Sequence, residues 1–187
     1  MRLFVALDFP DAVREAIREL IAKLKLLCKD ARWVRPEGMH ITLKFIGHVP
    51  AEKLDPIRAA LASVQSSAPV EIRFRGMGFF PNERRPRVAW CGMEASPNLA
   101  QLAADIERGL EPLGIAREER AFVPHLTLAR FESPRGVGEL VRQVQEMTPQ
   151  DFGSARETQF HLYESILKRA GAEYKKLESF PFVKGTA

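Results

Sequence analysis

Residues 40–49 read HITLKFIGHV, and the opening phrase returns at residues 125–128 as HLTL. In a β-strand, residues two apart point to the same face, so the histidine and the threonine of each copy should project together. The apolar residues beside them should project to the opposite face, toward a hydrophobic core. Each copy therefore predicts a strand that presents an imidazole and a hydroxyl on one side and packs its other side.

The duplication itself carries information about function. The chain has only four histidines, and a chain of this composition would show two such phrases by chance about once in a thousand. His48 and His161 stand in no repeated phrase, so we interpret them as structural. His40 and His125 are the candidate functional pair, with Thr42 and Thr127 beside them.

The remaining pattern alternates helices and strands without strict βαβ order, since strands often follow strands, and predicts an α+β fold. Apolar residues at three- and four-residue steps predict the helices, and alternating or short apolar runs predict the strands. Each half holds a helix, a His-x-Thr strand, another helix and a strand pair. We therefore expect one bilobal catalytic domain over residues 1–187, with two pseudo-symmetric, mainly antiparallel lobes around a central groove and helices outside. The expected helices cover about 10–27, 51–65, 98–113 and 137–147, and the strands about 2–9, 32–34, 40–49, 70–79, 87–93, 123–131, 152–158, 159–168 and 173–177.

Two imidazoles and two hydroxyls facing one groove suit the chemistry of a phosphodiester. In-line attack needs a base on the incoming oxygen and an acid on the leaving oxygen, and histidine can serve in either role near neutral pH. Threonine hydroxyls can donate hydrogen bonds to the non-bridging phosphate oxygens. This scheme requires neither a metal nor a cofactor. A metal site is the alternative interpretation, but no Asp, Glu or Cys stands at ligand spacing from either phrase.

Composition limits the other classes of function. A net charge of +4 fits an anionic partner such as RNA as well as it fits an ordinary solvated surface. Two cysteines in 187 residues give no disulfide framework, so a reducing cytoplasm is the expected location. The N-terminal stretch MRLFVALDFP is too short for a secretory signal, and the chain lacks a run of 18 apolar residues, so we expect no membrane association.

Several longer stretches resemble one known family. The chain is similar, from RLFVAL to FPF, to the RNA 2′,3′-cyclic phosphodiesterases, long called 2′-5′ RNA ligases, of the 2H phosphoesterase superfamily. Neither His-x-Thr phrase departs from the family pattern. The stretches that carry the resemblance are RWVRPEGMHITLKFIGHVP (32–50), FPNERRPRVAW (80–90), FVPHLTLARF (122–131), FHLYESIL (160–167) and GAEYKKLESFPF (171–182).

The resemblance implies an enzyme, expected to act as a monomer, that opens a 2′,3′-cyclic phosphate at RNA 3′ ends and leaves a 2′-phosphate. It implies His40 as the proton donor to the departing 3′ oxygen and His125 as the proton acceptor that activates water, although pseudo-symmetry leaves these roles reversible in principle. Thr42 and Thr127 would bind the phosphate.

Two more positions follow from the family pattern, each five residues after its histidine. Phe45 would stack on the terminal base, and Arg130 would approach the phosphate or nucleotide. Simple alternation conflicts with both, because an offset of five places a side chain on the face opposite the histidine. A bulge or a strand end would be needed. The alternatives are core packing for Phe45 and a surface position for Arg130.

Other activities fit the same residues. The acid–base pair run in reverse would ligate RNA ends, and a 2H enzyme could act on a small cyclic nucleotide or another phosphodiester. A non-catalytic RNA-binding module is a further alternative. The chain shows neither a Gly-x-x-Gly loop of the KH type nor an aromatic-rich RNP1 segment, and such a module needs no paired imidazoles.

Overall fold

The computed structural model describes residues 1–183 and confirms the α+β pattern. Each predicted helix and strand is present, with ends that differ by a few residues. The helices are α1 (Asp11–Leu24), α2 (Leu54–Ala62), α3 (Asn98–Leu110) and α4 (Gly138–Glu146), with short 3-10 turns η1 (Pro36–Gly38), η2 (Ala51–Lys53) and η3 (Glu111–Leu113). The strands are β1 (Arg2–Leu7), β2 (Arg32–Trp33), β3 (Ile41–His48), β4 (Val70–Phe80), β5 (Val88–Ala95), β6 (His125–Arg130), β7 (Asp151–Glu157), β8 (Gln159–Lys168) and β9 (Gly171–Pro181).

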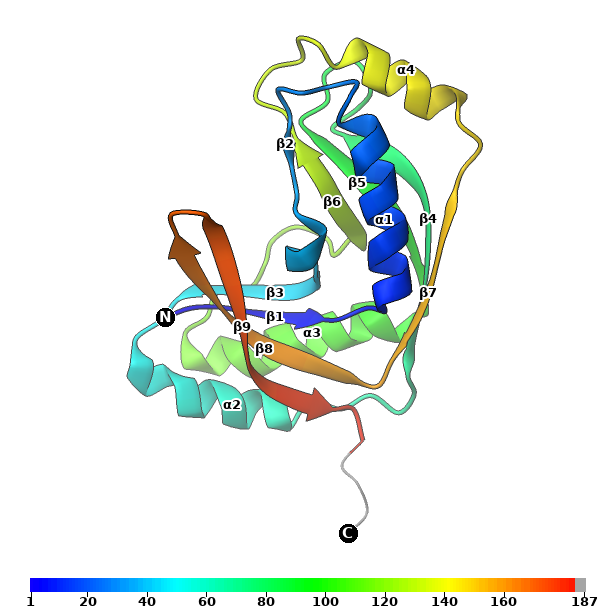
Figure 1. Ribbon diagram of the computed structural model, residues 1–187. Helices are drawn as coiled ribbons and strands as arrows, with labels where there is room; N and C mark the ends of the chain where they lie inside the picture. The colour runs from blue at the N-terminus through cyan, green and yellow to red at the C-terminus, as the bar shows by residue number, and fades with distance from the viewer. Residues whose placement is uncertain (184–187) are drawn as a thin grey trace.

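The strands form two antiparallel sheets, and each sheet carries one copy of the His-x-Thr phrase. The first sheet has the order β3-β1-β8-β9, and the second has the order β2-β6-β5-β4-β7. His40 directly precedes β3, which is an edge strand of the first sheet. His125 begins β6, which lies next to the short edge strand β2 of the second sheet. In Figure 1 the two sheets form two lobes, with α2 and α3 along the first sheet and α1 and α4 along the second.

The helices form because their apolar residues fall on one side, which packs on a sheet. The first helix ends at Leu24 rather than near residue 27, and Leu26, just beyond its end, is 75% exposed. The buried residues of α1 are Val13, Ile17, Leu20, Ile21 and Leu24.

One hydrophobic core connects the two sheets. It includes Val5 and Leu7 of β1 together with Phe74 of β4 and Ala89 of β5, all with no measurable exposure. Burial of this kind stabilises the fold by roughly 25 cal/mol for each square ångström of apolar surface removed from water. Within residues 1–183, no helix has the length and apolar character that crossing a membrane requires.

Candidate active site

A β-bulge in β3 brings Phe45 to the side of the sheet that carries His40. Ala6 of β1 pairs with Thr42, and the next residue, Val5, pairs with Lys44, so Leu43 is an extra residue in β3. Paired residues share a face, and an extra residue reverses the alternation that follows it. Phe45 therefore pairs with Phe4 and lies on the side of Thr42, where it is 69% exposed.

The second sheet has the same irregularity at the equivalent position. Trp90 of β5 pairs with Thr127 and Ala89 pairs with Ala129, so Leu128 is the extra residue. Arg130 then pairs with Val88 and lies on the side of His125 and Thr127. Consecutive burial of Leu128 and Ala129 marks the bulge. The offset of five is thus compatible with a shared face in both copies, as the family pattern requires and simple alternation does not.

The two sets of residues define two faces. The His40 face holds His40, Thr42 and Phe45, and the His125 face holds His125, Thr127 and Arg130.

A backbone hydrogen bond joins the segment before the His40 face to the strand of the His125 face. The amide of Val34, just after β2, donates a hydrogen bond to the carbonyl of Leu128 at 2.8 Å. His40 follows Val34 by six residues, while His125 precedes Leu128 by three. Since β2 runs antiparallel to β6, the chain from Val34 toward His40 continues in the direction of His125. The groove between the faces stays a prediction.

Both imidazoles are oriented in the same way. Nδ1 of His40 contacts the carbonyl of Gly38 at 3.0 Å, and Nδ1 of His125 contacts the carbonyl of Val123 at 2.7 Å. A carbonyl oxygen only accepts hydrogen bonds, so each Nδ1 must carry a proton. The free nitrogen of each ring is therefore Nε2, which can accept a proton when the ring is neutral and donate one when it is charged.

The segment before His40 is fixed from several sides. Arg14 of α1 donates hydrogen bonds to the carbonyls of Pro36 and Met39. Gly38 allows the ring of Tyr174 to approach closely, because a Cβ there would lie 2.8 Å from its Cε2. These contacts set the backbone from which His40 projects.

The surroundings of the two histidines differ. The His40 side chain is 11% exposed and packs against the rings of Phe4, Tyr163 and Tyr174, with ring centroids 5.8, 4.4 and 5.5 Å away. His125 contacts the ring of Phe80 edge-on at 5.2 Å. Burial lowers the pKa of His40 below its ordinary value, and the nearby Asp8 carboxylate offsets part of that shift.

Sequence patterns did not indicate the polar groups around Asp8, which follows β1. Its carboxylate accepts hydrogen bonds from Tyr163 Oη at 2.5 Å and Lys176 Nζ at 2.6 Å. It also lies 3.4 Å from Nε2 of His161 and 3.9 Å from Nε2 of His40. His161 is buried and its Nδ1 contacts Ser179 Oγ at 2.8 Å, which agrees with a structural interpretation of that residue.

A buried lysine connects the His40 strand to the loop that leads into His125. Lys44, directly after the bulge in β3, is 5% exposed. Its Nζ donates to Glu107 Oε2 at 2.8 Å and to the carbonyl of Ala116 at 2.6 Å, and the same Glu107 oxygen accepts from the amide of Glu118 at 3.3 Å. Lys44 thus fixes the start of the loop before β6.

Replacing Lys44 with methionine should destabilise the protein. Met fills the space but leaves the Glu107 carboxylate and the Ala116 carbonyl without their donor, which should lower the free energy of unfolding by about 3 kcal/mol. Urea denaturation measures this change. Lys25→Met, at an exposed position after α1, is the matched control. Equal unfolding midpoints for Lys44→Met and the wild type would contradict this prediction.

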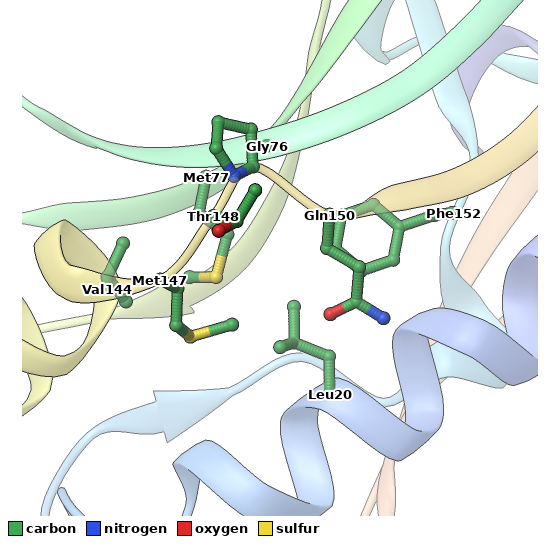
Figure 2. Close-up of a pocket in the computed structure, with 9 residues that line it drawn as sticks. Leu20, Gly76, Met77, Val144, Met147, Thr148, Gln150 and Phe152 are labelled. Atoms are coloured by element: carbon green, nitrogen blue, oxygen red, sulfur yellow. The ribbon is translucent and has the colours of Figure 1, made fainter.

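A cavity of about 80 Å³ lies away from both histidine faces. Figure 2 shows the side chains of Leu20, Met77 and Met147 converging on it from α1, β4 and the end of α4. Ligand sites for small molecules usually enclose 300–1,000 Å³. This cavity is therefore too small for a nucleotide and is not the candidate site. The remaining lining residues are Gly76, Val144, Thr148, Pro149, Gln150 and Phe152.

The metal site considered as an alternative would need several ligand side chains close together. Among residues 1–183, no group of three His, Cys, Asp or Glu side chains is placed to hold a metal ion.

An antiparallel two-sheet fold with one His-x-Thr phrase in each half is the architecture of the 2H phosphoesterase superfamily. The family model for LigT like phosphoesterases matches residues 7–90 and 93–174, one segment for each phrase, and the chain belongs to this family.

Named relatives extend over nearly the whole chain. An RNA 2′,3′-cyclic phosphodiesterase from Archaeoglobus fulgidus is 37% identical over 180 residues, covering 96% of this chain and 99% of the relative. A protein of the same name from Thermotoga maritima is 32% identical over 186 residues, covering 99% and 97%.

Solved structures agree in fold. TT0787 of Thermus thermophilus superposes with a TM-score of 0.78 at 34% identity, covering 97% of this chain and 98% of that one. The structure of E. coli LigT complexed with 3′-AMP gives a TM-score of 0.78 at 29% identity, covering 98% of both chains.

Proposed function

We propose that this protein hydrolyses the 2′,3′-cyclic phosphate at RNA 3′ ends and leaves a 2′-phosphate. The observation that carries the proposal is the repeated arrangement of histidine, threonine and bulge, which gives each sheet one imidazole with a free Nε2. The names of the relatives support the choice of substrate, and a bound 3′-AMP in a LigT structure is consistent with a terminal nucleotide.

In the proposed reaction, water attacks phosphorus from the side opposite the 3′ oxygen. Nε2 of neutral His125 accepts a proton from the water as its oxygen bonds to phosphorus. The bond between phosphorus and O3′ breaks, and O3′ takes the Nε2 proton of charged His40. Thr42 and Thr127 donate hydrogen bonds to the non-bridging oxygens, where negative charge grows in the transition state. Solvent then returns both rings to their starting protonation states.

We further propose that both sheets act as one bilobal catalytic domain, working as a cytoplasmic monomer. The core shared by β1, β4 and β5 supports a single domain, as does the connection that Lys44 makes to the loop before β6.

The direct test is an oligoribonucleotide that ends in a 2′,3′-cyclic phosphate, incubated with the enzyme in the presence of EDTA. We expect the cyclic end to open and to co-migrate with a 2′-phosphate standard. A second oligonucleotide with a 5′ hydroxyl in the same reaction reports ligation as a longer product. An intact cyclic end, or turnover that EDTA abolishes, would rule out the proposed chemistry.

Replacing Phe45 with alanine should weaken substrate binding. Stacking of a base on an aromatic ring contributes about 1–3 kcal/mol, so KM should rise by about fivefold or more while kcat changes little. Because Phe45 is 69% exposed, the substitution should leave the fold stable. Leu167→Ala, at an apolar position 72% exposed on β8, is the matched control. An unchanged KM in the Phe45 variant would remove this residue from the binding site.

A further inference from the structure

The two candidate catalytic histidines share their backbone geometry but not their electrostatic surroundings. Both rings donate from Nδ1 to the carbonyl two residues earlier, and both precede a bulge at the same offset. Symmetry of this kind gives no reason for one ring to be the acid and the other the base. Groups that lie beside only one of the rings can distinguish them.

Asp8 is such a group. Its Oδ1 lies 3.9 Å from Nε2 of His40, the nitrogen that would exchange the proton with substrate. A carboxylate at this distance stabilises a positive ring over a neutral one. Partial burial strengthens this attraction, since the His40 and Asp8 side chains are 11% and 30% exposed. Burial by itself lowers the pKa of His40, and Asp8 offsets part of that shift.

The neighbours of Asp8 hold it in place and keep it ionised. Tyr163 and Lys176 donate to its two oxygens, and His161 lies 3.4 Å from one of them. Burial raises the pKa of Asp8, but the hydrogen bonds from Lys176 and Tyr163, with the nearby charges of His161 and Lys176, together leave it below its ordinary value. The carboxylate therefore stays negative across the neutral range.

We propose that Asp8 is a positioning residue that favours a proton on Nε2 of His40, so that His40 donates to the leaving 3′ oxygen and His125 accepts from water. This inference rests on the proposed function and gives a physical basis, in Asp8, for two roles that the repeated geometry leaves equal. Asp8 itself exchanges no proton with substrate, because its oxygens are engaged by Tyr163 and Lys176.

Other charged groups also act on His40 and set the sign of the expected effects. Arg14 of α1 and Lys176 of β9 both disfavour a positive ring, while Asp8 and the Gly38 carbonyl favour it. Tyr163 faces the ring with a neutral hydroxyl, because burial and the Asp8 carboxylate raise its pKa. Removing Asp8 and removing Lys176 should therefore change His40 in opposite directions.

The experiment uses the whole enzyme labelled with ¹⁵N-histidine, with ring signals assigned from His40→Gln and His125→Gln. Titration by NMR should show a lower midpoint for His40 in Asp8→Asn and a higher midpoint in Lys176→Met. In Asp8→Asn, kcat/KM for the cyclic end at pH 7 should fall about tenfold, because fewer rings carry the proton to donate. Asp105→Asn, on the outer helix α3, is the matched control and should alter neither quantity. Thermal melting confirms that each variant is folded.

The possible outcomes separate the two proposals. An unchanged His40 midpoint in Asp8→Asn would overturn the role of Asp8, whatever the activity. A lower midpoint with undiminished kcat/KM at pH 7 would also overturn it, because a ring that acts as the base gains from losing its proton. Absence of any cyclic-phosphate opening by the wild type would instead refute the proposed function.

Discussion

Replacing His125 with alanine should lower kcat/KM for opening a terminal 2′,3′-cyclic phosphate by about 10²- to 10⁴-fold, the usual contribution of a positioned acid or base. Without an imidazole at this position, water must lose its proton to solvent during attack. The same range applies to His40→Ala, where the 3′ oxygen would leave without a proton. KM should change less than kcat in both variants, since the threonines and Phe45 are retained.

The two substitutions should not add. The proposed pair works in a single displacement, and removing one member disables the other, so the double variant should be about as slow as the slower single variant. His48→Ala is the control, because His48 is exposed at the far end of the same strand, β3. Full activity in either His40→Ala or His125→Ala would exclude that residue from the reaction.

The secondary structure was largely predictable because it depends on local patterns. The buried stripe of α1 and the alternation along β4 are visible in the sequence, and both elements occur where those patterns lie. The ends were less predictable. The final strand, β9, runs over Gly171–Pro181 rather than 173–177, because its ladder with β8 extends to the hairpin.

The bulges could not be predicted from either strand alone, because a bulge is a relation between two strands. The phrase around His40 reads as a regular alternation, and only pairing with β1 shows that Leu43 is an extra residue. The sequence did contain a signal, because simple alternation placed Phe45 and Arg130 on the face opposite the histidines, whereas the family pattern placed them on the same face. That conflict required either a bulge or a strand end, and the structure has a bulge in each copy, at Leu43 and Leu128.

The cluster around Asp8 was missed for a different reason. Asp8 follows a buried strand and looks like an ordinary strand end. Its two hydrogen-bond donors, Tyr163 and Lys176, are 155 and 168 positions away in sequence. The order β1-β8-β9 in the first sheet brings all three together, and no short-range pattern encodes that order.

Removing the hydroxyl of either threonine should also lower kcat strongly. Thr42→Val and Thr127→Val keep the size and branching of the side chain but remove the hydroxyl, so neither strand should be disturbed. Losing one donor to a developing oxyanion typically costs about 10²- to 10³-fold in kcat. We expect each valine variant to lose rate within that range, because negative charge on the non-bridging oxygens grows as water attacks. Steady-state kinetics on the cyclic-phosphate oligonucleotide measures the loss.

Serine variants at the same positions separate hydrogen bonding from packing. Thr42→Ser and Thr127→Ser retain the hydroxyl and lose only a methyl group, so they should keep most of the wild-type rate. If serine and valine variants were equally slow, the threonines would act through shape rather than as donors. If the valine variants kept full activity, other groups would have to hold the phosphate. The proposed transition state would then need hydrogen-bond donors other than the two threonines.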